Sequence, residues 1–347
     1  MLKINDFIAD SKIIVSEAMQ KIDDNAGGIL FLTDDYGKLI ACVTDGDIRR
    51  YLLAGGKMNS EIILAANKRP CYAISIDEAK HIYNKKKLRS IPIVDEDMTI
   101  IDIYGDSDMF TKTRPNLHVP VVINAGGKGT RLAPYTKVLP KPLIPIGDLP
   151  ILEHIMNEYQ SYDCTDFHII VNYKRDLMKA YFADNERAYN ITWYDEEKPL
   201  GTGGGLSLLK GVFKDTFFFA NCDALLTADY ESMLKFHKEN GNVITMICAY
   251  KNINIPYGVV DMGVNGVIEG MREKPLMSFL TNTGIYIVEP SVVDSMVDGE
   301  AIGFPDVVER ERQKGHKVAV YPVSENDWMD MGQIPELEKM RIKLYGE

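Results

Sequence analysis

The sequence lacks several features that mark particular classes of protein. No apolar run approaches the roughly 18 residues that would predict a membrane-spanning helix, and the N-terminus has no hydrophobic export signal. The five cysteines are an odd number and include no Cys-x-x-Cys spacing, which indicates reduced thiols in the core. We therefore predict a cytoplasmic protein with no membrane partner.

Positive charge and histidine are also scarce. Lys and Arg together number 39 against 50 Asp and Glu, which gives a formal net charge of -11. A nucleic-acid partner is not predicted, because such binding needs a basic face. The six histidines show no paired ligand spacing, which argues against a zinc site. Local groups of basic residues are therefore expected to bind small anions.

What is present is typical of a globular protein with more than one domain. The chain has 347 residues, of which 46% are hydrophobic and 26% are charged, so it can bury a large core in two or three domains. Beyond residue 118, predicted strands and helices alternate, which favours a parallel βαβ arrangement with ligands at the carboxyl ends of the strands. These elements are expected at 151–162, 166–173, 175–185, 191–195, 304–314, 317–323 and 334–344.

The most informative stretch runs from Val119 to Pro142. An apolar run leads into a glycine-rich turn, where backbone N–H groups can converge on phosphate oxygens, with Arg131 adding charge. Lys141 follows between two prolines that stiffen its backbone. A plain strand-to-helix turn is the alternative, but the lysine context favours a phosphate cradle. Its glycines are Gly126, Gly127 and Gly129.

A second glycine-rich turn, 200–205, is predicted to open a helix through Phe213. Its glycines would let a flat base lie against the backbone, although a mobile loop or a helix cap remains the alternative. Further along, the apolar strand 216–223 stops at Asp223, and Asp330 lies in a later Trp-x-Asp-x-Gly element. Two carboxylates near a phosphate cradle suit a hard divalent cation, Mg²⁺ or Mn²⁺.

Residues 1–113 contain a weak internal repeat of a helical segment followed by two extended runs joined by a turn. The helical segments begin at Ser16 and at Ile76. A polar stretch, 106–116, then forms a linker. We predict two small modules at 1–57 and 58–113, a connection at 114–118, and one larger α/β domain at 119–347.

These motifs carry a family resemblance. Ala-Gly-Gly-x-Gly-Thr-Arg-Leu from Ala125, followed by Pro-Lys-Pro, resembles the signature of sugar-1-phosphate nucleotidyltransferases, over about two thirds of the chain. The repeat resembles a tandem pair of CBS modules. The resemblance implies a Rossmann-like, glycosyltransferase-A-like mixed-sheet domain preceded by a small α/β pair. In that family a sugar-1-phosphate oxygen attacks the α-phosphorus of a nucleoside triphosphate and pyrophosphate leaves.

The resemblance also implies roles for individual residues. Catalytic roles fall on Arg131, Lys141, Asp223 and Lys274. Nucleotide-binding roles fall on Ala125, Gly126, Gly127, Gly129, Thr130, Arg131, Lys141, Gly201, Thr202 and Gly203. Sugar-phosphate roles fall on Gly258, Glu273, Lys274, Asn282 and Gly284. Metal-binding roles fall on Asp223 and Asp330. A hairpin turning at Asn265-Gly266 is expected within the sugar-phosphate region.

The resemblance leaves the substrate and the role of the modules open. Tandem CBS modules upstream favour guanylyltransferases that make GDP-activated amino sugars for legionaminic-type acids, with GTP and glucosamine 1-phosphate as substrates. Mannose- and heptose-1-phosphate guanylyltransferases share every motif, and a non-catalytic nucleotide sensor is a further alternative. Thr44 and Asp47 match a ribose-binding spacing, whereas Tyr104 and Ser107 in the second module do not. The modules could bind a regulatory nucleotide or assemble a homodimer or tetramer.

Overall fold

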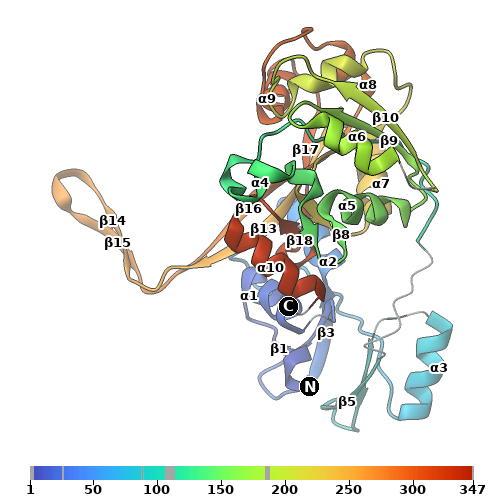
Figure 1. The fold of residues 1–347 in the computed structure, drawn as a ribbon. Coiled ribbons are helices and arrows are strands. Elements are labelled where there is room, and N and C mark those ends of the chain that lie inside the picture. The colour runs from blue at the N-terminus through green and yellow to red at the C-terminus, as the bar shows by residue number, and fades with distance from the viewer. Residues whose placement is uncertain are drawn as a thin grey trace. The chain divides into compact units, whose positions relative to one another are not determined.

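A computed structural model describes residues 4–25, 27–86, 88, 90–105, 114–183 and 188–345. Contacts divide the chain into two units (Figure 1). The first comprises Met1–Lys112 and Tyr250–Leu280, and the second comprises Thr113–Ala249 and Thr281–Glu347. The predicted larger domain is one continuous segment, whereas here its stretch Tyr250–Leu280 groups with the first unit. The linker residues 106–113, Ser107 among them, lie outside the described residues.

The first unit contains both repeats. In the first repeat, β1 (Ile8–Asp10), β2 (Ile29–Thr33) and β3 (Leu39–Thr44) form a sheet in that order, with helices α1 (Val15–Asn25) and α2 (Asp45–Leu53). In the second, α3 (Ile76–Lys86) precedes the antiparallel pair β4 (Ser90–Val94) and β5 (Ile100–Gly105). Short 3-10 turns occur at Ile4–Phe7 and Ile62–Leu64.

The two repeats contact each other through their hairpins. Leu39 donates its backbone N–H to the carbonyl of Met98 at 2.8 Å. Ile29 and Phe31 of the first repeat share a hydrophobic cluster with Val94 of the second. The repeat predicted from sequence is therefore one packed pair, held by apolar burial together with backbone pairing.

The second unit is built around a mixed sheet of seven strands in the order β10-β9-β6-β11-β16-β13-β17. The pairs β10/β9, β9/β6, β6/β11 and β13/β17 are parallel, and β11/β16 is antiparallel. The strands are β6 (Val121–Asn124), β9 (Asp166–Val171), β10 (Asn190–Asp195), β11 (Phe217–Asn221), β13 (Ile244–Asn254), β16 (Leu276–Val288) and β17 (Val318–Val323).

Helices cover both faces of this sheet (Figure 1). Strand β11 shows why, because Phe218 packs in one apolar cluster while Phe217 and Phe219 pack in the other. Alternate residues of a strand point to opposite faces, so a strand that is apolar throughout requires two covers. The first cluster holds α5 (Ile151–Gln160), α6 (Arg175–Ala183), α7 (Tyr230–Asn240) and α10 (Ile334–Tyr345), and the second holds α8 (Pro290–Asp294) and α9 (Phe304–Gln313).

Smaller elements complete the described structure. Helix α4 (Tyr135–Val138) lies between 3-10 turns at Thr130–Leu132 and Lys141–Leu143, and other 3-10 turns occupy Gly204–Leu209, Val264–Gly266 and Glu325–Asp327. Two-stranded ribbons pair β7 (Pro145–Ile146) with β8 (Leu149–Pro150), β12 (Ala224–Leu226) with β18 (Trp328–Asp330), and β14 (Val259–Met262) with β15 (Ile268–Arg272).

The strand order places a site. Strand β6 has β9 on one side and β11 on the other. After β6 the chain moves to β9 and then β10, whereas after the neighbouring β11 it moves in the opposite direction, to β13 and β16. Ligands of open α/β sheets bind where the order reverses, outside the carboxyl ends of the strands. In this chain that location is the turn that begins after Asn124, which is the predicted phosphate cradle.

Candidate active site

The cradle has the backbone that the glycines predict. Gly129 has φ +61, in the left-handed region, and a Cβ there would lie 2.9 Å from the Cβ of Lys141. A Cβ on Gly126 would lie 2.8 Å from Glu196 Oε2, whereas Gly127 has open space. Close packing therefore requires glycine at 126, and close packing together with φ requires it at 129. Gly127 leaves the backbone accessible.

Lys141 and Asp223 meet beside the cradle. The ammonium group of Lys141 donates a hydrogen bond to Asp223 Oδ2, and both side chains are nearly buried. Because charge-assisted hydrogen bonds away from water are strong, the pair fixes both side chains. Lys141 is located by the 3-10 turn Lys141–Leu143, and Asp223 follows β11 directly. The structure thus brings together two predicted catalytic residues.

Asp330 reaches the same place through strand pairing. In the β12/β18 ribbon Asp330 lies opposite Ala224, and Met331 donates its N–H to the carbonyl of Asp223 at 2.9 Å. Burial, and then the negative charge of Asp223, raise the pKa of Asp330, while the charges of Lys141 and Arg131 oppose that rise. Asp330 therefore interacts electrostatically with one carboxylate, Asp223, and with two cationic side chains, Lys141 and Arg131.

The second glycine turn is linked to the cradle by Asn124. Its side-chain amide donates to the carbonyls of Gly201 and Thr202, at 3.2 and 3.1 Å. The Thr202 hydroxyl in turn accepts the backbone N–H of Phe304 at 3.0 Å. The predicted nucleotide-binding residues of the two turns therefore lie side by side, with Thr202 anchored at the start of α9.

The glycines of this turn pack closely against another part of the chain. A Cβ on Gly203 would lie 2.9 Å from Phe304 Cα, and one on Gly204 would lie 2.2 Å from the Glu300 carbonyl oxygen. These glycines therefore give room to the chain at 300–304, and the base contact expected at this turn stays a prediction. The helix predicted through Phe213 is also wrong, since only the 3-10 helix Gly204–Leu209 forms where the chain packs against that backbone.

Glu196 was not predicted to take part, yet it lies between the two turns. A Cβ on Gly205 would lie 2.6 Å from its Oε1, and one on Gly126 would lie 2.8 Å from its Oε2. The residue is 3% exposed, and Oε1 has no hydrogen-bond partner among the described residues. Burial raises the pKa of Glu196 to about 7, partly offset by the Leu200 N–H. Its position just after β10, at a strand's carboxyl end, was the available signal.

Of the predicted sugar-phosphate residues, Asn282 and Gly284 lie on β16 in the second unit. Gly284 has φ +78, and a Cβ there would lie 2.4 Å from Asn221 Nδ2, at the end of β11. Asn282 accepts the Gly284 N–H at 3.0 Å and donates to the Tyr286 hydroxyl at 2.6 Å. This part of β16 therefore borders the strand end that leads to Asp223.

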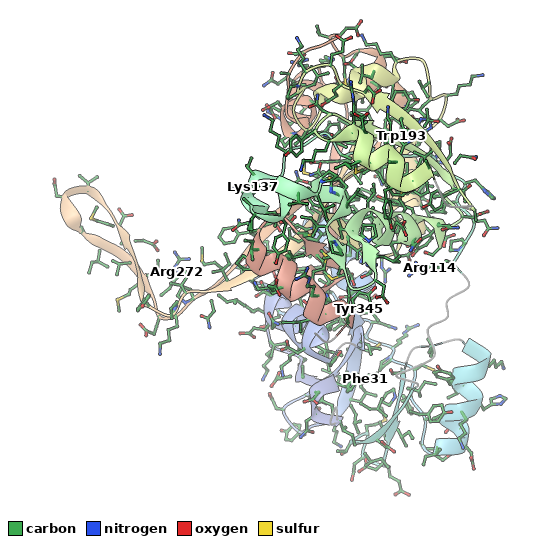
Figure 2. The ribbon with its side chains drawn as sticks, in the orientation of Figure 1. Phe31, Arg114, Lys137, Trp193, Arg272 and Tyr345 are labelled. Carbon is green, nitrogen blue, oxygen red and sulfur yellow. The ribbon has the colours of Figure 1, made fainter. Side chains whose placement is uncertain are left out.

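The other predicted sugar-phosphate residues belong to the segment that groups with the first unit. The expected hairpin forms as β14 and β15, and Asn265 at its turn has φ 60. A Cβ on Gly258 would lie 3.0 Å from Glu273 Oε2, so these two residues are adjacent. Lys274 has φ 43, a conformation that non-glycine residues seldom adopt. Arg272, which pairs with Asp261 across the ribbon, is labelled in Figure 2.

The predicted ribose-binding pair of the first module is already engaged. Thr44 and Asp47 form a capping box at the start of α2, in which each side chain accepts the other residue's backbone N–H. The second oxygen of Asp47 pairs with Arg50 at 2.5 Å. A nucleotide at this position would share these side chains with the helix cap.

Within the described residues no group of three or more His, Cys, Asp or Glu side chains is arranged to hold a metal ion. The predicted metal ligands are two, and Mg²⁺ is held in many sites by one or two carboxylates with substrate phosphates completing its shell. The donor set therefore fits Mg²⁺, with waters or a substrate phosphate completing its shell. The part of the chain that the structure describes contains no helix with the length and apolarity needed to cross a membrane.

Known proteins resemble about three fifths of this chain. It is 34% identical over 227 residues to a mannose-1-phosphate guanyltransferase of Pichia angusta. This match covers 61% of this chain and 60% of that protein. It is 31% identical over 240 residues to a UTP–glucose-1-phosphate uridylyltransferase of Synechocystis, covering 62% and 60%. The chain thus spans about 60% of the length of these curated relatives.

Solved structures agree in fold. The crystal structure of HddC from Yersinia pseudotuberculosis superposes with a TM-score of 0.51 at 21% identity, over 65% of this chain and 99% of that one. This likeness shows the mixed α/β fold alone. The family model described as nucleotidyl transferase matches residues 120–345, which include the cradle, Lys141, Asp223 and Asp330. The chain therefore belongs to the nucleotidyl transferase family.

Proposed function

We propose that this chain transfers a nucleoside monophosphate, GMP from GTP, to a sugar 1-phosphate and releases pyrophosphate. One observation carries the proposal: Lys141, Asp223 and Asp330 gather at the glycine cradle, with the charge of Arg131 acting on the same group. Two cationic side chains beside a phosphate cradle suit a triphosphate, whose charge they would offset as pyrophosphate leaves.

The reaction needs no side-chain nucleophile, because the phosphate oxygen of a sugar 1-phosphate is itself nucleophilic at neutral pH. The residues then have to bind and orient two phosphates and offset charge. Asp223 and Asp330 would hold Mg²⁺, which neutralises phosphate charge when it is bound. Asn282 and Gly284 border the Asp223 side and are assigned to the sugar phosphate. Gly258, Glu273 and Lys274 keep the role that the family motif predicts for them.

Glu196 supports guanine as the base. A buried carboxylate with an oxygen that lacks a partner calls for N–H donors. Guanine offers two adjacent donors, N1–H and the N2 amino group, whereas uracil and thymine offer a single N3–H between two acceptors. One of the relatives is named for guanylyl transfer and another for uridylyl transfer, so their names do not decide the base. Glu196 is the feature of this chain that favours GTP.

The sugar is proposed from the upstream repeat pair and from the names of the relatives. Glucosamine 1-phosphate, leading to an activated amino sugar for legionaminic-type acids or surface glycan, follows from the upstream repeat pair. Mannose 1-phosphate is the second candidate, because several relatives are named mannose-1-phosphate guanyltransferases, and heptose 1-phosphate is a third. A non-catalytic sensor is less favoured, because Arg131, Lys141, Asp223 and Asp330 are all present.

The test is a matrix of GTP, ATP, UTP, CTP and dTTP against glucosamine, mannose, glucose and heptose 1-phosphates, with Mg²⁺. Pyrophosphate release is measured, and the nucleotide sugar is identified by mass spectrometry. Asp223→Asn serves as the control for contaminating enzymes. We expect the highest kcat/KM with GTP. If the chain binds nucleotide but turns over no pair of substrates, the hypothesis of a non-catalytic sensor replaces that of an enzyme.

A further inference from the structure

The segment from Thr130 to Leu139 joins the cradle to Lys141, and little apolar packing holds it. Only Leu132 and Thr136 within it are buried, while Arg131 and the residues on either side of Thr136 are exposed. A ten-residue surface segment with two buried side chains is expected to open locally at low cost. Polar contacts must therefore supply much of what fixes it.

Those contacts come from two neighbouring residues outside the segment. Lys174 Nζ donates to the carbonyls of Lys137 and Val138, at 2.6 and 2.7 Å. The Tyr173 hydroxyl donates to the Thr136 carbonyl at 3.3 Å. These are the last carbonyls of α4, which have no partner within the helix, and a cation at a helix C-terminus is favourable. Lys137, on α4, is labelled in Figure 2.

One of the two, Tyr173, also contacts the start of the cradle. The backbone N–H of Tyr173 donates to the Gly126 carbonyl at 3.4 Å. Within the segment, the Thr136 hydroxyl donates to the Gly129 carbonyl at 3.0 Å. Tyr173 and Lys174 thus connect the first glycine of the cradle to the turn of helix that immediately precedes Lys141.

Lys174 adopts a costly backbone conformation to do this. Its φ is 53, in the left-handed region that residues other than glycine seldom enter. It stands immediately before α6, where its carbonyl accepts the N–H groups of Leu177 and Met178. Lys174 Nζ also lies 5.3 Å from the centre of the Tyr173 ring. Strained backbone conformations cluster at functional sites, so the conformation of Lys174 points to a functional role.

We infer that Lys174, with Tyr173, is a positioning residue for nucleotide binding: it holds 130–139 in the arrangement in which the cradle and Lys141 receive the triphosphate together. This inference rests on the proposed function. It predicts a particular kinetic signature. If only a fraction of molecules has the segment in place, the apparent affinity for nucleotide falls by that fraction, while nucleotide at saturation restores the competent state.

The test compares Lys174→Met, which keeps an apolar stem, with Lys174→Arg, which can still donate to two carbonyls. Lys179→Met is the matched control, because Lys179 lies on α6, which directly follows Lys174, and pairs with Asp195 at 2.7 Å instead. In the full chain, Lys174→Met should raise KM for GTP about ten-fold, with kcat at saturating GTP and KM for the sugar phosphate within two-fold. Lys174→Arg should recover most of the loss, and Lys179→Met should match wild type.

A purely structural role would give a different result, since global destabilisation lowers the amount of active enzyme and hence kcat, with KM unchanged. That outcome, or an unchanged KM for GTP, would overturn the inference. Hydrogen exchange provides a measurement that does not depend on catalytic turnover. The amides of Lys137 and Leu139, bonded to the carbonyls of Pro134 and Tyr135, should exchange faster in Lys174→Met and slow again when GTP is added.

The hydrogen-exchange measurement separates the positioning role of Lys174 from the proposed reaction. If wild type turns over no substrate pair, the proposed function fails, but exchange and calorimetric GTP binding still decide whether Lys174 holds the segment. Faster exchange with weaker GTP binding would then support the positioning role. Unchanged exchange and unchanged GTP affinity would reject it whatever the reaction is.

Discussion

Lys141 and Asp223, 82 residues apart in the chain, are hydrogen-bonded to each other at the carboxyl edge of the sheet. In the proposed reaction each has a different task, the lysine on phosphate and the aspartate on a cation. Their pairing keeps two opposite charges satisfied in a nearly buried location until substrates arrive. The pair therefore holds both side chains in place at the cradle.

Replacing Lys141 by Met should separate catalysis from cation binding. The loss of one charged donor should lower kcat by about 10²- to 10³-fold, or roughly 2.7–4 kcal/mol in the barrier. Asp223 would lose its partner, so calorimetry without nucleotide should show tighter Mn²⁺ binding than in wild type. Lys235→Met, a surface change on α7, should alter neither quantity. An unchanged kcat for Lys141→Met would remove the lysine from the site.

Activity should depend on a divalent cation and on both acids. Hard oxygen ligands prefer Mg²⁺ or Mn²⁺, and each carboxylate contributes charge to the binding. Asp223→Asn and Asp330→Asn should each increase the Mg²⁺ concentration needed for half-maximal pyrophosphate release, and EDTA should abolish turnover in wild type. Asp298→Asn, at an exposed ion pair with Lys210, is the control. Full activity in EDTA would exclude a cation from the reaction.

Changing Glu196 to Gln should alter base preference. The amide keeps one acceptor but presents an N–H₂ to the second donor of guanine, while it can match the donor–acceptor edge of uracil. Loss of such a paired contact costs about 1–3 kcal/mol, so the ratio of kcat/KM for GTP over UTP should fall about ten-fold or more. Glu197→Gln, the exposed neighbour, should leave the ratio as it is. A ratio equal to wild type would place the base elsewhere.

The same substitution should change stability in a pH-dependent way when no nucleotide is present. Burial raises the pKa of Glu196 from 4.5 to about 7 in the folded chain, so between these values the folded state holds a proton that the unfolded state has released. Stability of wild type therefore falls as pH rises from about 4.5 to 7. Glu196→Gln should melt higher than wild type at pH 8, with a smaller difference at pH 5. Equal differences at both pH values, measured by calorimetry, would contradict this.

In the first unit, Asp47→Ala should destabilise the fold whether or not a nucleotide binds there. Loss of the capping box at α2 is expected to cost about 0.5–2 kcal/mol. Chemical unfolding measures that loss, and Asp24→Ala, on an exposed part of α1, is the comparison. Titration of the full chain with AMP, ATP and GTP tests the proposed regulatory site separately. Wild-type heat that survives in Asp47→Ala would show that the nucleotide is bound by other residues.

Much of the second unit could be predicted from the sequence. Helix α5, expected at 151–162, spans Ile151–Gln160, and α10, expected at 334–344, spans Ile334–Tyr345. Periodicity and turn chemistry report the local backbone, so they place elements with an error of a few residues. The cradle was predictable for the same reason, because Gly129 needs a positive φ in its own turn.

Tertiary structure alone decided which distant residues meet. Asp330 stands beside Asp223 because β18 pairs with β12, and no local pattern specifies that pairing. The close approach of the chain at 300–304 to the glycines at 203 and 204 is likewise not expressed in the sequence. Glu196 is buried between two turns, which sequence spacing does not express. Local motifs fix backbone conformation, but proximity and desolvation depend on strand order and packing, and these set the chemistry of the site.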